Sequence, residues 1–462
     1  MNIIIGAGLA GLSCSYHLGH EGWLVLEQGA SAFGHASSLR QSGFTWDQGP
    51  HVSFTKHEYV RELFVQAVGG EFEEFPVCVS NYFQGTWINH PAQTALFQVP
   101  EPLRTECLQS FLHSRSLAGE PDPINYAQWL DAAFGSTFAK TFPAAYTRKY
   151  WTVEPAALST DWLGGRVLKP DVDAVLAGSK GPMPHSTHYI NTVRYPRRGG
   201  YQSFAKSMAK DARIRFGSRV VRVDLDQRSV WLADGECMKY QALINTIPLP
   251  DFINACINVP LNVRDAARAL SCTQLLMVNV GVHGVSPRPE HWIYVYDEDK
   301  ISTRLSFTDK LAKNNAPGPG WTGVQAEVYF SRYKPLLTDP SSIGARVHEE
   351  LVEMGVLPSE TLAQVVSGQG NITTSIAPWA NVIFLHDTKA ALDEIWQWLA
   401  KYGLVREQDD THPLTDWTRG NAVERNRSAA SLSMAGRFGQ WKYFWSDDCV
   451  MRGRQLANSL QK

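Results

Sequence analysis

The first 27 residues constrain the fold more than any other part of the chain. The segment 2–27 reads NIIIGAGLAGLSCSYHLGHEGWLVLE: an apolar run, a glycine-rich turn, an amphipathic stretch and a second apolar run that ends in an acid. Gly6, Gly8 and Gly11 match G-x-G-x-x-G, a motif that carries information when it lies between a strand and a helix. The first glycine permits a tight turn, the second lets a diphosphate approach the backbone, and the third lets helix and strand pack closely. The free N–H groups and the positive end of the helix dipole then bind phosphate.

Glu27 lies 19 residues after Gly8. This is about the twenty-residue offset at which a carboxylate meets a ribose hydroxyl of a bound dinucleotide. The segment therefore predicts a dinucleotide-binding βαβ unit, against the alternative of an ordinary turn at a helix start. The fingerprint alone does not separate NAD from FAD.

Further motifs resemble one superfamily of flavoproteins, that of the amine oxidases, protoporphyrinogen oxidases and UDP-galactopyranose mutases. The resemblance covers most of the chain and is weakest over 401–430. Its motifs are GFTWDQGPHVSF (43–54), RYPRRGGYQSFAKSMA (194–209), RVVRVDLD (219–226), LINTIPLP (243–250), YTRKYWTVEPAALSTDWLGGRV (146–167) and GRFGQWKYFWSDDCV (436–450). The last two are similar to the nucleotide-clamping loop and the G-R-x-G-x-Y-x-Y segment of the mutases, and favour that branch.

The resemblance implies an α/β fold with a discontinuous, Rossmann-like FAD-binding domain. That domain is expected to comprise 1–75, 190–255 and 430–462. Residues 76–189, with helical spacing, are expected to form a mainly helical substrate or lid domain. Residues 256–429 are expected to form an antiparallel-sheet substrate domain, with an exposed polar loop near 406–430. The expected strands of that domain lie at 275–281, 292–297, 301–307 and 323–330.

The same resemblance supplies residue roles. The expected cofactor-binding residues are Gly6, Gly8, Gly11, Glu27, Gly49, His51, Val221 (by its backbone, to adenine), Arg437 (to the FAD diphosphate) and Trp441. The expected substrate-binding residues are Gln93, Trp151 (stacked on a base), Arg166, Arg304 and Tyr443. Of these residues, His51, Arg304 and Tyr443 are the catalytic candidates. Guanidinium groups bind phosphate bidentately and a phenol adds a neutral donor, which suits the grip on a diphosphate.

Three departures from the mutase pattern bear on specificity. Phe33-Gly34 replaces the usual double glycine of the flavin loop, Thr152 replaces a glycine, and Trp441 replaces the first tyrosine.

The function implied is a flavin-dependent pyranose/furanose mutase acting on a nucleoside-diphosphate sugar. In such an enzyme N5 of reduced FAD attacks the anomeric carbon, so NAD(P)H or another reductant is an expected partner. The alternative is an FAD-dependent amine oxidase or desaturase, similar to protoporphyrinogen oxidase, in which hydride passes to the flavin. A third hypothesis is a flavin-holding scaffold without activity, but an arginine-lined cleft is more than a scaffold needs.

Composition bears on the other functional classes, namely nucleic-acid-binding, metal-binding and membrane proteins. The 462 residues carry a net charge of −2 and no long basic run, so no nucleic-acid partner is predicted. The seven cysteines are scattered, and neither they nor the histidines have metal-ligand spacing, so no metal site is predicted. No signal peptide and no apolar run of about eighteen residues is evident, which favours a soluble, cytoplasmic protein without a membrane span.

Overall fold

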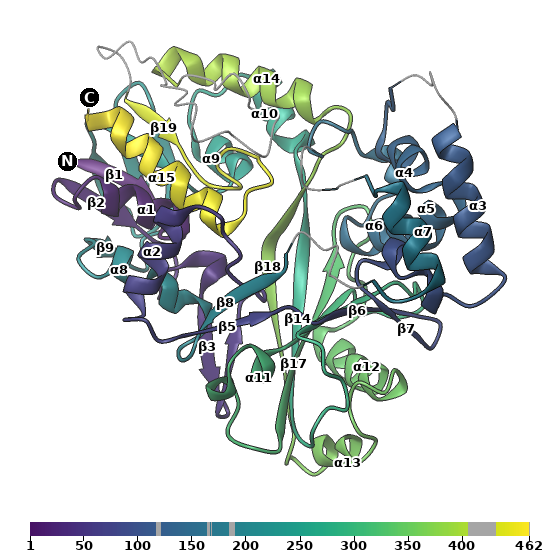
Figure 1. The fold of residues 1–462 in the computed structure, drawn as a ribbon. Coiled ribbons are helices and arrows are strands. Elements are labelled where there is room, and N and C mark those ends of the chain that lie inside the picture. The colour runs from purple at the N-terminus through teal and green to yellow at the C-terminus, as the bar shows by residue number, and fades with distance from the viewer. Residues whose placement is uncertain (117–121, 164–166, 168, 184–189, 405–430, 462) are drawn as a thin grey trace.

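The computed structural model describes residues 1–116, 122–163, 167, 169–183, 190–404 and 431–461. Figure 1 shows three parts: a lobe that contains the glycine-rich turn and both termini, a helical lobe on the opposite side, and a long sheet between and below them. We call the first part the nucleotide-binding lobe, after the expected role of its glycine-rich turn. We call the long sheet the roof sheet.

The nucleotide-binding lobe is built on a parallel sheet of five strands among the described residues, in the order β19-β13-β1-β2-β9. Its strands come from three distant segments of the chain. They are β1 (Asn2–Ile5), β2 (Trp23–Leu26), β9 (Ile214–Arg215), β13 (Leu243–Asn245) and β19 (Leu432–Met434). The central strands are apolar and buried, as parallel sheets require when helices cover both faces.

Two helices from opposite ends of the chain pack tightly beside this sheet. They are α1 (Leu9–His17) and α15 (Ser446–Gln461). A Cβ added to Gly453 would lie 2.5 Å from the Ser13 Cβ atom, and the Ser13 hydroxyl donates to the carbonyl of Val450 over 2.6 Å. This close approach fixes the C-terminal segment against the glycine-rich turn.

The roof sheet has the order β18-β14-β17-β16-β15-β6-β7 among the described residues, and every pairing except β15–β6 is antiparallel. Its strands are β6 (Val79–Phe83), β7 (Thr86–Asn89), β14 (Ser271–His283), β15 (Trp292–Val295), β16 (Arg304–Phe307), β17 (Trp321–Phe330) and β18 (Asn371–Ile383). Each of the four runs expected as strands overlaps a strand of this sheet, namely β14, β15, β16 and β17. The sheet differs from expectation in that β6 and β7 extend it, although they lie in the segment expected to be mainly helical. Four- and five-residue strands leave too few repeats for periodicity to reveal them.

The helical lobe is attached to the roof sheet by a buried cation. Its helices are α3 (Leu103–Ser116), α4 (Tyr126–Phe134), α5 (Ser136–Ala139), α6 (Ala145–Tyr150) and α7 (Val172–Lys180), with a π-helical turn at Lys140–Ala144. The Lys149 Nζ atom donates to the carbonyls of Val295, Asp297 and Ser302 over 2.7–3.0 Å. Because an ammonium has three protons, these carbonyls satisfy it fully and hold α6 on the roof sheet.

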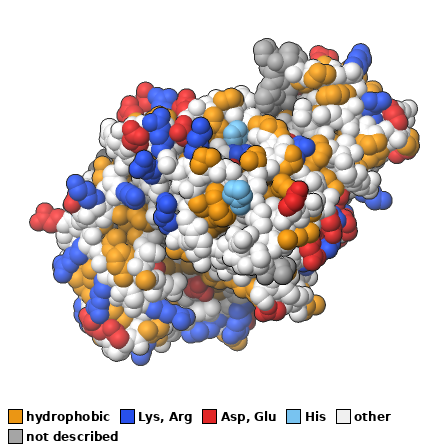
Figure 2. All heavy atoms as spheres, turned by 90° about the horizontal axis from the view of Figure 1, so that it is seen from below, with side chains coloured by type: hydrophobic (Ala, Val, Ile, Leu, Met, Phe, Trp, Pro, Cys, Tyr) orange, Lys and Arg blue, Asp and Glu red, His pale blue; other side chains and the backbone are white. Residues whose placement is uncertain are grey.

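The other elements complete the three parts. They are β3 (Ser38–Gln41), β4 (Phe44–Asp47), α2 (Glu58–Ala67), β5 (Phe72–Pro76), β8 (Thr192–Pro196), α8 (Lys206–Ala209), β10 (Val220–Asp224), β11 (Ser229–Leu232), β12 (Cys237–Lys239), α9 (Leu249–Ala255), α10 (Leu261–Ala269), α11 (Thr308–Leu311), α12 (Pro340–Glu353), α13 (Thr361–Val366) and α14 (Thr388–Leu399). Of the helices in the described ranges, none has both the length and the hydropathy to cross a bilayer. On the face seen from below, basic and acidic side chains lie among hydrophobic ones (Figure 2).

Candidate active site

The glycine-rich turn has the geometry that its sequence predicts. Gly6 has φ +99°, and a Cβ on Gly11 would lie 2.0 Å from the Gly6 carbonyl oxygen. A Cβ on Gly8, by contrast, would meet no described protein atom within 4 Å. The first and third glycines are thus required by the protein itself, while the space beside the second is open to a ligand.

Glu27 holds this turn from the end of β2. Its two carboxylate oxygens accept hydrogen bonds from the backbone N–H groups of Ala7 (2.8 Å) and Gly29 (2.7 Å). Each oxygen keeps a further lone pair, so a ribose hydroxyl can still be accepted. Val221, the expected adenine contact, lies at a bulge in β10 with its side chain 44% exposed.

The second loop of the expected flavin site crosses the first. The Phe33 N–H donates to the Ala7 carbonyl over 2.8 Å, and a Cβ on Gly34 would lie 3.1 Å from the Gly8 Cα atom. Phe33 has φ +80° where the mutase pattern has glycine. The other two departures behave alike, with φ +61° at Thr152 and +55° at Trp441. The backbone at all three positions therefore keeps a left-handed conformation that costs a non-glycine residue free energy.

His51 lies in the turn after β4. Its ring stacks on Tyr201, with ring centroids 5.2 Å apart, and its Nδ1 atom hydrogen-bonds to the Gly49 carbonyl. Burial, helped by the positive charges of Arg304 and Arg437, lowers the pKa of His51 to about 4. His51 is therefore neutral at pH 7, and two arginines from different parts of the fold act on it.

Asp47, which carries no role in the sequence analysis, organises this turn. Its buried carboxylate accepts hydrogen bonds from the Ser38 hydroxyl (2.6 Å), the Tyr195 hydroxyl (2.8 Å) and the Tyr201 N–H (3.1 Å). Burial raises the pKa of Asp47 to about 6. The signal was present in the sequence, because Asp47 lies in the motif GFTWDQGPHVSF (43–54), two residues before Gly49 and four before His51.

Arg304 lies on β16 and is paired with a buried carboxylate. Its Nε and Nη2 atoms donate to one oxygen of Glu327 over 2.9 and 2.6 Å, and Glu327 is 1% exposed. The Tyr329 hydroxyl donates to the other oxygen over 2.7 Å. Although burial disfavours its charge, the Glu327 carboxylate raises the pKa of Arg304 above its usual value.

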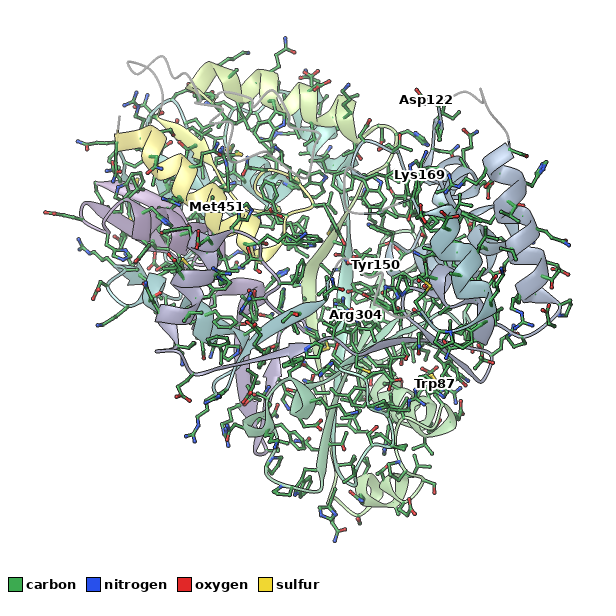
Figure 3. All side chains as sticks on the ribbon, in the orientation of Figure 1. Trp87, Asp122, Tyr150, Lys169, Arg304 and Met451 are labelled. Atoms are coloured by element: carbon green, nitrogen blue, oxygen red, sulfur yellow. The ribbon has the colours of Figure 1, made fainter. Side chains whose placement is uncertain are left out.

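Arg437 connects the C-terminal segment to the roof sheet. Its Nη2 atom donates to the Asn381 Oδ1 atom over 2.7 Å, and its Nη1 atom donates to the Phe444 carbonyl over 3.3 Å. The guanidinium also lies over the Tyr443 ring at 4.7 Å. The hydroxyls of Tyr443 and Tyr150 are 3.2 Å apart, so the helical lobe joins the same cluster. Tyr150 and Arg304 lie in the middle of the molecule, between the two lobes (Figure 3).

The remaining expected residues differ in their surroundings. Trp151 is 7% exposed, packs on Trp162 with centroids 4.7 Å apart, and donates its indole N–H to the Val382 carbonyl over 3.3 Å. These contacts are those of a hydrophobic anchor of the helical lobe, and the expected stacking of Trp151 on a base stays a prediction. Trp441 is 1% exposed in the core of the nucleotide-binding lobe. Gln93 is partly buried in a short 3-10 turn. Arg166 lies outside the described residues.

Features of the described residues fit a flavin dinucleotide. They are the open space at Gly8, the start of α1 without a side-chain cap, and the buried Arg437 Nε atom without a hydrogen-bond partner. Helix-start N–H groups and a guanidinium are donors suited to a diphosphate. A cavity of about 470 Å³ lies elsewhere, beside β6 and β7, lined by Trp87 and Glu290 among others. None of the predicted site residues that the structure describes lines it.

Comparison with known proteins gives three kinds of match. The model of the flavin-containing amine oxidoreductases matches residues 9–307. A zeta-carotene-forming phytoene desaturase of Myxococcus xanthus is 34% identical over 85 residues, which is 17% of this chain and 16% of that protein. Among solved structures, reduced UDP-galactopyranose mutase superposes with a TM-score of 0.84 at 21% identity, covering 100% of this chain and 95% of that one. A protein described as a protoporphyrinogen oxidase from Exiguobacterium sp. 255-15 superposes with a TM-score of 0.71 at 15% identity, covering 100% and 98%.

Proposed function

The chain belongs to the family of flavin-containing amine oxidoreductases, and we propose that it is a flavin-dependent mutase of nucleoside-diphosphate sugars. It would interconvert the pyranose and furanose forms of the sugar with no net oxidation. The single observation that carries this proposal is the meeting of Arg304, Arg437, Tyr150 and Tyr443 around the turn of His51. Such a cluster suits a diphosphate leaving group better than a neutral ring or an amine.

When bound, the reduced flavin would supply the nucleophile for the anomeric carbon. The protein's task is then to hold the departing diphosphate. Arg304 would stabilise the negative charge that develops as the glycosidic C–O bond breaks, and Arg437, expected at the FAD diphosphate, would add positive charge beside it. Burial raises the pKa of Tyr150 well above its usual value, so its hydroxyl stays protonated and keeps donating to the Asn381 Oδ1 atom beside Arg437. His51, neutral at pH 7, would act by hydrogen bonding rather than by charge.

The alternative is an FAD-dependent oxidase or desaturase. The match to a phytoene desaturase favours it, and so does a wall of buried tyrosines near Arg304. Tyr146 and Tyr150 stack with centroids 5.6 Å apart, and Tyr146 meets Tyr294 edge-on at 5.5 Å. Such a wall could also hold an apolar polyene or porphyrin-like ring.

A redox assay separates the two functions. A mutase should bind UDP or another nucleoside diphosphate and convert the sugar only after the flavin has been reduced, for example by NAD(P)H or dithionite. It should consume no oxidant in proportion to product. Sustained, substrate-dependent formation of peroxide, or failure of UDP, GDP, dTDP, CDP and ADP to bind at millimolar concentration, would reject the mutase in favour of the oxidase.

A further inference from the structure

Asn381 lies where the three parts of the fold meet. It is 4% exposed on β18, and its backbone N–H donates to the Thr273 hydroxyl on β14 over 3.1 Å. Its Oδ1 atom accepts two hydrogen bonds, from the Tyr150 hydroxyl at 2.8 Å and from the Arg437 Nη2 atom at 2.7 Å. One side-chain oxygen thus joins the roof sheet, the helical lobe and the C-terminal segment.

Two donors at this junction have no partner among the described residues. They are the Asn381 Nδ2 atom and the Arg437 Nε atom, both fully buried. Because the Tyr150 hydroxyl and the Arg437 Nη2 atom both donate to the same side-chain atom of Asn381, that atom is the amide oxygen. The atom without a partner is therefore the amide nitrogen. Leaving a buried donor unsatisfied destabilises the folded protein, so such a group calls for an acceptor. The missing group must therefore be a hydrogen-bond acceptor.

The charge around these donors shows which acceptor fits. The Arg304 guanidinium is compensated by the Glu327 carboxylate. The Arg437 guanidinium, in the part of the chain that the structure describes, hydrogen-bonds only to neutral oxygens, those of Asn381 and Phe444. An anion is favoured next to Arg437 because no carboxylate of the described residues pairs with its charge.

We propose that Asn381 is a binding residue that donates, together with Arg437, to a phosphate oxygen of a bound diphosphate. The diphosphate is that of the nucleotide-sugar substrate or that of FAD. The first source rests on the proposed function, whereas the second requires only a flavin. The amide suits this position because it adds a donor to the anion without neutralising the arginine, which a carboxylate would do.

The decisive variant is Asn381→Asp. A carboxylate oxygen still accepts from Tyr150 and Arg437, so the junction is kept, but the Nδ2 donor becomes an acceptor that repels a phosphate. Asn279→Asp is the matched control: Asn279 is 7% exposed on the neighbouring strand β14, and its side chain is bonded to Thr373 and Gln325. Asn381→Ser, which keeps a hydroxyl donor and adds no charge, serves if the aspartate variant does not fold.

Binding is measured in two titrations. In the first, the flavin-free protein is titrated with FAD and followed by flavin fluorescence. In the second, the FAD-loaded, dithionite-reduced protein is titrated with UDP and followed by tryptophan fluorescence. We expect Asn381→Asp to weaken one of these ligands at least tenfold, Asn381→Ser to weaken the same ligand less, and Asn279→Asp to change neither by more than threefold.

The changes in FAD and UDP affinity together show which ligand supplies the phosphate. Loss of UDP affinity with unchanged FAD affinity assigns Asn381 to the substrate diphosphate, and the converse assigns it to the cofactor. If neither affinity changes, or if both fall together with a melting temperature far below that of Asn279→Asp, Asn381 is a structural junction and the proposal is overturned. If the unmodified protein binds no UDP, the mutase function fails, and the FAD titration alone decides the role of Asn381.

Discussion

Arg304 and Glu327 lie directly opposite each other on β16 and β17, and two nitrogens of the guanidinium, Nε and Nη2, donate to the same carboxylate oxygen. The arginine that sequence motifs assign to a diphosphate thus already has a negative partner. Glu327 is 1% exposed, so its charge depends on Arg304 in turn. Removing either residue therefore affects the folded state as well as ligand binding.

Arg304→Ala should destabilise the protein by about 3–5 kcal/mol, because it leaves the Glu327 carboxylate buried and unpaired. The double variant Arg304→Ala, Glu327→Gln should recover most of that loss, since no buried charge remains. Denaturant unfolding of the original protein, Arg304→Ala, Glu327→Gln and the double variant measures the coupling free energy between the two residues. Nucleotide binding is then compared between the original protein and the double variant. An equally unstable double variant would show that the pairing is not the cause.

Glu327→Gln alone should strengthen the binding of UDP, provided that the mutase function is correct. The amide oxygen can still accept from Arg304, but the guanidinium charge is no longer neutralised. We expect an affinity gain of a fewfold to tenfold, as charge-assisted hydrogen bonds are worth about 1.5–3 kcal/mol against about 0.5–1.5 for neutral ones. Weaker UDP binding in a variant with a normal melting temperature would contradict this prediction.

Gly8→Val and Gly11→Ala should impair the protein in different ways, the first in FAD binding and the second in stability. A Cβ at Gly8 meets no described protein atom, so Gly8→Val should fold and lose FAD by obstructing the diphosphate path. A Cβ at Gly11 would lie 2.0 Å from the Gly6 carbonyl, so Gly11→Ala should lower the stability of the flavin-free protein itself. Thermal melts without flavin, followed by FAD titration, separate the two effects. A folded Gly8→Val variant with normal FAD affinity would place the diphosphate elsewhere.

Thr152 stores strain at the start of the segment after α6. Its φ of +61° is unfavourable for a β-branched residue by about 1–2 kcal/mol, while its hydroxyl donates to the Ser331 hydroxyl over 2.6 Å. Thr152→Gly should be close to neutral, because relief of strain offsets the lost hydrogen bond. Thr152→Val keeps the strain and loses the bond, so it should be the less stable of the two by about 2 kcal/mol in chemical denaturation. Equal stabilities would mean that this backbone is not strained.

Acid should destabilise the flavin-free protein through His51. The pKa of His51 is about 4 in the folded protein and about 6.5 in the unfolded chain. The contribution of His51 to the free energy of unfolding is therefore fully present above pH 6.5 and is lost as the pH falls towards 4. The loss is at most about 3 kcal/mol. Asp47 acts in the opposite direction, because its raised pKa of about 6 makes it stabilising at low pH and costly as the pH rises through 6. His51→Gln should flatten the fall in melting temperature between pH 6.5 and 4, while the exposed His113→Gln should not.

Trp151→Ala should destabilise the helical lobe by about 3–5 kcal/mol, as expected for a buried tryptophan. Trp151→Phe should restore part of the packing. Urea unfolding followed by circular dichroism measures both. Unchanged stability combined with a loss of affinity for one nucleotide base only would return Trp151 to the base-stacking role.

The sequence by itself determined the local geometry of the nucleotide-binding turn. Gly6, Gly8 and Gly11 are neighbours along the chain, and their roles follow from local sterics that any such strand-turn-helix must satisfy. The apolar runs that became β14–β17 were also readable, because strand periodicity is a local property. The left-handed backbone at Phe33 and Thr152 was not predicted, since it is imposed by the surrounding structure against the residue's own preference.

Only the tertiary structure decided how the site residues are paired. Tyr150 and Tyr443 are 293 positions apart, and Arg437 and Asn381 are 56 apart, yet each pair is in hydrogen-bonding contact. A motif shows that an arginine or a tryptophan is present, but its partner and its burial depend on segments that meet only when the chain is folded. For this reason the motifs predicted Arg304 as a diphosphate ligand without its Glu327 partner, did not give the burial of Trp151, and left Asn381 unnoticed.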